Sequence, residues 1–213
     1  VGSISTEFLI EHLQTRQIGS VNIEDLAPIV AIHKGEVVPP IGVHYNEKYN
    51  IVILNFLTKG KDHEWKFAEA IKQIAEKLEA KEIISLEGVA GGNEEQKTYA
   101  FSNDNNKINH LIELGFTKLE ESIVVGVSAA LLIMKTNITA FFAMTSSQLP
   151  DSGAAAELIK ALDKYLGLEV DYHPLYEQAK KFEDKIKDLL VKTQEAMDEK
   201  EKEAIIKEWD TDK

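Results

Sequence analysis

The sequence predicts an α/β protein with a three-layer core, in which helices cover both faces of a mostly parallel sheet, and a long helix at the C-terminus. Strand and helix patterns alternate through residues 1–170, and several of the strands are almost continuously apolar. Such runs are typical of strands buried on both faces. After Pro174 glycine and proline are absent, and apolar residues recur at helical spacing. We therefore expect a core domain over residues 1–170 and a helical extension over residues 171–213.

The chain is expected to begin with a helix over Ser3–Arg16, because its apolar residues fall near one face and Ser3 can cap its first turn. A run rich in β-branched residues, Pro28–His33, predicts a strand. A second strand is expected over Val37–His44. Two prolines interrupt it, which favours an edge position or a bulge.

A buried strand and a strongly periodic helix come next. Tyr49–Phe56 is apolar on both faces, and Lys61–Leu78 keeps its apolar residues at helical spacing. Ile83–Leu86 is expected to be a short strand that leads into a glycine-rich loop, Gly88–Asn93. Another strand is expected over Thr98–Phe101.

The rest of the core is expected to alternate between helix and strand. Glycines mark two helix ends, since Gly115 and Gly167 follow the last residues of apolar periodic segments. The expected elements are a helix over Asp104–Leu114, a strand over Ile123–Val125, a helix over Val127–Lys135, a strand over Ile138–Met144 and a helix from Pro150-Asp151 to Tyr165.

The composition is acidic and lacks cysteine, with a formal net charge of −12 over 213 residues. Such a chain repels phosphate backbones and anionic lipids, so we expect neither a nucleic-acid nor a membrane partner. The longest apolar stretches fall short of the roughly 20 residues that cross a bilayer, and no signal peptide is visible, so a cytoplasmic location is expected. The absence of cysteine excludes disulfides and thiolate metal sites. No histidine pair has metal-site spacing, and no cofactor is expected.

The C-terminal segment carries a narrow apolar seam whose members are spaced alternately four and three residues apart. This heptad-like pattern favours self-association through a partner helix. The alternative is that the helix packs back on its own domain. The interface candidates are Leu175, Ala179, Phe182, Ile186, Leu189 and Thr193. Beyond the seam, Ile205, Ile206 and Trp209 are candidates for anchoring in a partner's pocket, or for packing within the oligomer.

Ser128 lies in Gly126–Ala130, between an expected strand and an expected helix, which is the context of a nucleophile elbow. Asp151 or Asp171, and then His173, follow in the chain order of a hydrolase triad. The favoured alternative is that Ser128 caps the helix that starts there. Gly88–Asn93 follows a strand and could cradle an anion, but it lacks the phosphate-loop patterns and is followed by two glutamates. A flexible loop is favoured.

Several segments, which follow one another in a particular order along the chain, are also informative. They are Val1-Gly2 with the first helix, Glu64-Trp65 with its helix, Ile83–Val89, Gly126–Leu132, Leu149-Pro150-Asp151 with Ala154–Ala156, and Leu166–Leu168 with Pro174-Leu175. Together they resemble the proteasome assembly chaperone family in its archaeal form, over nearly all of residues 1–190. The resemblance implies a fold like that of purine nucleoside phosphorylases without their activity, homo-oligomers, and a role in assembling or binding the 20S proteasome. Some relatives dock through a C-terminal hydrophobic–Tyr–any tripeptide, and Thr211-Asp212-Lys213 departs from that pattern.

We therefore expect a non-enzymatic, protein-binding scaffold that self-associates and engages the 20S proteasome. The alternative is a small-molecule hydrolase or a nucleoside phosphorylase-like enzyme. A deep pocket with converging polar groups near Gly88–Asn93, Ser128 and Thr145–Ser147 would favour the enzyme. Closely packed apolar side chains in that region would count against it.

Overall fold

A computed structural model describes residues 1–23, 30–33, 35–56, 62–90, 98–145 and 151–181. The chain divides into two compact units, residues 1–172 and 173–213. The second unit is described as far as residue 181, and residues 173–181 of it form a helix.

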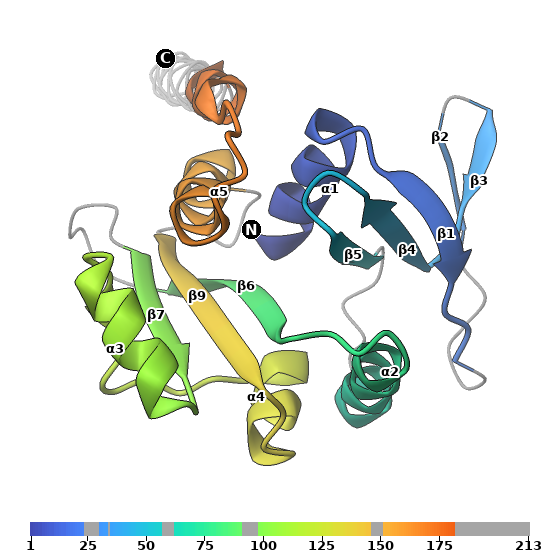
Figure 1. Cartoon of the computed structure of the whole chain (residues 1–213). Helices are drawn as coiled ribbons and strands as arrows, with labels where there is room; N and C mark the ends of the chain where they lie inside the picture. Colours follow the sequence, from blue (N-terminus) through green and yellow to red (C-terminus); the bar gives the residue numbers. More distant parts are fainter. Residues whose placement is uncertain (24–29, 34, 57–61, 91–97, 146–150, 182–213) are drawn as a thin grey trace, which may run out of the picture. The chain divides into compact units, whose positions relative to one another are not determined.

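The first unit contains the labelled helices and strands of Figure 1. Its helices are α1 (Gly2–His12), α2 (Glu64–Lys77), α3 (Asn105–Glu113), α4 (Gly126–Ile133) and α5 (Ser152–Leu166). Its strands are β1 (Arg16–Ser20), β2 (Ala31–His33), β3 (Glu36–Val38), β4 (Ile41–Asn46), β5 (Ile51–Phe56), β6 (Ile83–Ala90), β7 (Thr98–Ser102), β8 (Thr117–Lys118) and β9 (Ile138–Thr145).

The described strands form three separate sheets, and most of their pairings are antiparallel. One sheet has the order β1-β4-β5, another is the β2-β3 hairpin, and the third has the order β6-β9-β7-β8. In the third sheet β6 pairs with β9 and β7 with β8 in parallel, while β7 and β9 are antiparallel. The prediction of a mostly parallel sheet is therefore wrong. A short turn joins β4 to β5, and such a turn can connect antiparallel neighbours but not parallel ones.

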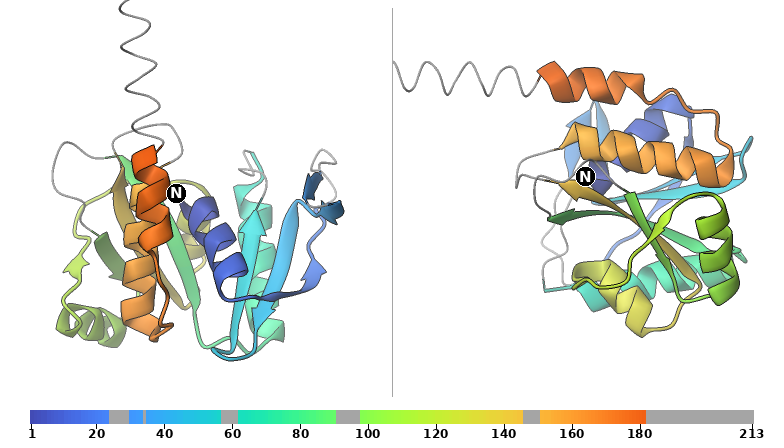
Figure 2. Two further views of the ribbon diagram at one scale, coloured as in Figure 1. Left: turned by 90° about the horizontal axis from the view of Figure 1, so that it is seen from above. Right: turned by 90° about the vertical axis from the view of Figure 1, so that its left-hand side faces the viewer.

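Helices lie on both faces of the four-stranded sheet. α5 packs on β9 with α1 beside it, while α4 packs on the opposite face against α2 (Figures 1 and 2). The central strand β9 is buried from Ile138 to Ala143, as its continuous apolar sequence predicts. Phe141 is fully buried, and its ring centroid lies 5.2 Å from that of Phe116 and 5.6 Å from that of Tyr165. Burying one such ring stabilises the fold by about 1.5–3 kcal/mol, so β9 is the centre of the core.

The helix boundaries follow local backbone signals. α1 ends at His12 rather than Arg16, because Gln14 adopts a left-handed conformation with φ of 50°. α5 ends as expected at Gly167, whose φ of 66° is a conformation that glycine adopts without strain. Arg16 instead begins β1, an exposed edge strand that the sequence analysis did not anticipate.

Three strand predictions need correction. Ile123–Val125 is irregular rather than a strand, with Ile123 and Val125 exposed, because these β-branched residues pair with no strand in the described part of the chain. β5 is antiparallel and partly exposed, not buried on both faces, since it pairs only with β4 within its sheet. β6 extends through Gly88 to Ala90, so the first part of the expected Gly88–Asn93 loop is strand. Its last three residues lie outside the described segments.

Candidate functional site

Ser128, the candidate nucleophile, belongs to a small hydrogen-bonded cluster between β6 and α4. Ser85 and Glu87 are two residues apart on β6, so their side chains point to the same side of the strand. The Oγ atoms of Ser85 and Ser128 are 2.6 Å apart, and Ser85 Oγ donates to Glu87 Oε1 at 3.1 Å. Ser128 Oγ also donates to Glu87 Oε1. Two hydroxyl protons serve these three contacts, and the carboxylate of Glu87, which only accepts, receives at least one of them.

This cluster does not have the geometry of a nucleophile elbow. The sharp turn lies at Gly126, whose φ is 79°, whereas Ser128 is the third residue of the helix and only 3% exposed. Within the described part of the chain, the side-chain hydrogen bonds of Ser128 go to Ser85 and Glu87 and not to an imidazole. The capping interpretation is also wrong, because Val125 occupies the N-cap and no side-chain cap bond forms. Ser128 fixes α4 to β6 instead.

Asp151, the candidate acid, has a structural role as well. Its Oδ1 accepts a hydrogen bond from the backbone N–H of Ala154 at 2.8 Å, which makes it the N-cap of α5. Its Oδ2 accepts from Thr145 Oγ1 at 2.8 Å. One carboxylate oxygen is thus engaged at the start of α5 and the other by the last residue of β9. Ser146 and Ser147 lie outside the described segments, and His173 belongs to the second unit.

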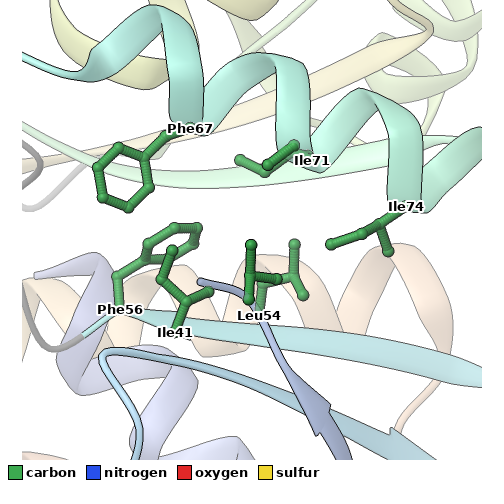
Figure 3. Close-up of a pocket in the computed structure, with 8 residues that line it drawn as sticks. Ile41, Leu54, Phe56, Phe67, Ile71 and Ile74 are labelled. Atoms are coloured by element: carbon green, nitrogen blue, oxygen red, sulfur yellow. The ribbon is translucent and has the colours of Figure 1, made fainter. Parts of the chain in front are cut away.

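The gap between α2 and the β4-β5 pair is lined by apolar side chains and is too narrow to hold a water molecule. Figure 3 shows Phe67, Ile71 and Ile74 of the helix facing residues of the strands. The rings of Phe56 and Phe67 lie 5.4 Å apart. The partners of these helix residues on the strands are Ile41, Leu54 and Phe56. This region is a packed part of the core, so it offers no ligand site.

A second, open hollow of about 280 Å³ lies where α2 ends and where α4 turns into β9. Charges of both signs line it, among them Lys72, Glu76 and Lys135. Its volume falls just below the roughly 300–1,000 Å³ of typical small-molecule pockets. It lies at the C-terminal end of α4, and Ser128 is near the N-terminal end. Among the described residues, moreover, no three His, Asp or Glu side chains gather as metal ligands would.

Glu82, immediately before β6, organises the most extensive polar network of the first unit. Its carboxylate accepts from Lys107 Nζ at 2.8 Å, from Thr139 Oγ1 at 2.9 Å and from the Tyr165 hydroxyl at 3.0 Å. Burial, reinforced by the charge of Glu82, raises the pKa of Tyr165 to about 12. The network joins β6 to α3, β9 and α5. Since each polar group has a partner within the network, its evident role is to hold these elements together.

Several large apolar side chains are exposed, and some of them gather in two places. On the β2-β3 hairpin, Ile32 and Val37 are cross-strand partners, so they share one exposed face. Around α4, Ile123, Val125 and Ile133 are exposed. Contiguous apolar surface of this kind marks contacts with other macromolecules. The sequence context of these residues predicts strands and a helix, but it does not predict that their side chains are exposed.

The predicted interface and anchor residues fall mostly outside the described segments. Leu175 and Ala179 lie on the helix over residues 173–181. The other predicted residues, Phe182, Ile186, Leu189, Thr193, Ile205, Ile206 and Trp209, lie beyond it. Within the described residues, no helix combines the length and the apolar character needed to cross a bilayer.

Comparisons with known proteins agree with the resemblance found in the sequence. The family model of the PAC2 family matches residues 1–190. The uncharacterized protein MJ0106 of Methanocaldococcus jannaschii is 26% identical over 213 residues, which cover 95% of this chain and 86% of that protein.

Solved structures are also similar. The crystal structure of Pyrococcus furiosus PbaA, an archaeal homolog of proteasome-assembly chaperone, has a TM-score of 0.81 and 26% identity, covering 94% of this chain and 87% of that one. Pyrococcus furiosus PbaB, an archaeal proteasome activator, has a TM-score of 0.74 and 17% identity, covering 88% of this chain and 87% of that one. The likeness to PbaB is one of fold.

Proposed function

Because the chain belongs to the PAC2 family, we propose that it is a non-enzymatic, protein-binding scaffold that assembles or binds the 20S proteasome. The observation that carries this proposal is the family match over residues 1–190, together with the likeness of the whole fold to PbaA. An expectation from sequence alone, that the chain resembles archaeal proteasome assembly chaperones, is confirmed by that match.

The chemistry of the described residues supports a binding role. Ser128 and Asp151, two of the candidate triad residues, each hydrogen-bond to neighbours that hold a helix in place. The described hollows are either filled with apolar side chains or shallow and of mixed charge. Exposed apolar residues are instead found on the outer surface of the first unit, where polypeptides rather than small substrates would meet them.

The remaining parts of the proposal concern the oligomeric state of the protein and its location in the cell. The protein acts in the cytoplasm as a homo-oligomer, joined through the seam that runs from Leu175 to Thr193. Its core is a three-layer domain similar to purine nucleoside phosphorylases, and its last residues, Ile205, Ile206 and Trp209, anchor in a partner. The narrow width of the seam supports this, since it suits a single partner helix.

The direct test is capture of purified 20S particles by the immobilised protein. We expect the full chain to retain the particles, and a chain cut after Leu190 or carrying Trp209→Ala to retain fewer. The matched control is Trp65→Ala, which removes an exposed tryptophan from α2 in the first unit. If the full chain neither retains 20S particles nor changes the assembly rate of their subunits, the proteasome role is refuted.

A further inference from the structure

The outer side of α4 and the segment before it form an exposed apolar surface, here called the α4 surface, made of Ile123, Val125, Gly126, Ala129 and Ile133. Ile123 is 91% exposed, Val125 75% and Ile133 66%. A Cβ atom placed on Gly126 would have no neighbour within 4 Å among the described residues, so they leave the space beside the helix start open. Figure 1 shows α4 on the outside of the first unit, with α2 and β9 on its other sides.

The composition of α4 indicates that this surface is normally covered. Apart from Ser128, the other seven of the eight residues of the helix are apolar, and a helix that is apolar all round is usually buried all round. Its inner side is buried, with Ala130 and Leu131 packed in the core that α2 and β9 share. Gly126, Ala129 and Ile133 recur at intervals of three and four, so they form one outer stripe. The outer side therefore lacks the second layer that its composition requires.

The charges at the two ends of the α4 surface indicate which polypeptide binds there. Glu120 and Glu121 precede it and Lys135 follows it, and all three are exposed. Among the described residues these three form no ion pair with one another or with others. Residues 122–134 lie between Glu121 and Lys135, and the helix accounts for eight of them, about 12 Å at 1.5 Å per residue. A copy of the same surface turned by a two-fold axis would place Lys135 of each chain opposite the glutamates of the other.

We propose that the α4 surface is a contact between two copies of this chain, with the two α4 helices antiparallel. A parallel arrangement would bring like charges together, and a chain with a net charge of −12 can approach itself most easily through a face without charged side chains. The small residues Gly126 and Ala129 let the helix axes come close. This contact builds on the proposed self-association, but it uses a surface of the first unit and does not need the C-terminal seam.

The test compares the masses of full-length variants by light scattering and sedimentation. Val125→Asp with Ile133→Asp places two charges on exposed positions, where they should not disturb the core. We expect a smaller species than wild type. In a background that also carries Phe182→Asp and Ile186→Asp, where the seam is removed, we expect the change from dimer to monomer. Ile112→Asp, on the exposed side of α3, is the matched control and should leave the mass unchanged.

A charge exchange tests the antiparallel arrangement. Lys135→Glu should weaken dimerisation at least about fivefold, since it replaces two exposed ion pairs by repulsion. Adding Glu120→Lys and Glu121→Lys to the same chain should restore the original affinity. If restoration fails, the antiparallel arrangement is wrong. If the Val125 and Ile133 changes leave the mass unaltered in both backgrounds, or if the wild type is monomeric, the contact itself is refuted. Failure of the wild-type chain to retain 20S particles, with the mass changes as expected, would instead refute the proteasome role and leave the contact standing.

Discussion

The hydrogen bonds that Glu82 accepts from Lys107, Thr139 and Tyr165 lead us to expect a loss of stability when one of the donors is removed. Lys107→Met removes the cation 2.8 Å from Glu82 Oε2 and keeps most of the side-chain volume. The side chains of Lys107 and Glu82 are 20% and 17% exposed, so the carboxylate would lose its counter-charge in a mostly buried place. Thr139 and Tyr165 would still donate to it. We expect the folded state to be clearly destabilised.

The expected loss of unfolding free energy lies between two limits. Breaking a fully buried ion pair costs about 3–5 kcal/mol, and exposed pairs contribute about 0.2–1 kcal/mol. The remaining exposure of Glu82 and its two hydroxyl donors move the cost below the buried limit. We therefore expect Lys107→Met to lower the free energy of unfolding by about 2 kcal/mol. With a urea m-value of about 2 kcal/mol/M, the midpoint should fall by about 1 M.

The assay is urea unfolding of the full chain, followed by far-ultraviolet circular dichroism at neutral pH. The control is Lys72→Met, because Lys72 lies 4.0 Å from Glu76 on the more exposed side of α2. That change should cost less than about 0.5 kcal/mol. Equal midpoints for Lys107→Met and Lys72→Met would show that the Glu82 network contributes no more than a surface ion pair.

Two further predictions concern the same unit. The pKa of Tyr165 is raised to about 12 from 10.0, so folding favours the neutral phenol, and the resulting stability is present below pH 10 and is lost as the pH rises toward 12. Urea midpoints at pH 9 and pH 11 should therefore fall further for wild type than for Tyr165→Phe, and equal falls would contradict the argument. Asp151→Ala should cost about 1 kcal/mol through loss of the α5 cap, while Asp151→Asn should cost little because asparagine caps equally well. Equal thermal midpoints for these two variants would show that the cap contributes nothing.

The sequence predicts best those elements whose apolar periodicity is long and unambiguous. α2, α5 and β9 are of this kind, because many residues report on the same face. β1 was missed because an exposed edge strand carries no apolar alternation, and its pairing with β4 alone defines it. Ile123–Val125 was wrongly predicted as a strand because β-branched residues favour strands only where a neighbouring strand is available. The direction of the strands was predicted wrongly because it was inferred from the alternation of strand and helix segments. That alternation does not show where a short turn joins two antiparallel strands.

The site residues were harder to predict, for a different physical reason. Ser85 and Glu87 lie on one strand, and Ser128 follows 41 residues after Glu87. Their contact depends on how α4 packs on β6, which no local pattern specifies. The α4 surface did leave a signal in the sequence, since the helix has no polar face to turn toward water. From the sequence we predicted a helix over Val127–Lys135 without inferring which of its sides is exposed, and Ile133 is 66% exposed.

The buried serine cluster and the exposed α4 surface are connected by the same helix. A helix that is apolar all round gains similar hydrophobic stabilisation from burying either side, so hydrophobic burial alone does not fix its rotation about its axis. Ser128 is the polar residue of α4, and an unpaired buried hydroxyl costs about 1–3 kcal/mol. Its hydrogen bonds to Ser85 and Glu87 therefore favour the rotation in which Ala130 and Leu131 face the core. In that rotation Ala129 and Ile133 necessarily face outward. The feature that first suggested a catalytic serine thus determines which apolar side chains remain available to a second polypeptide.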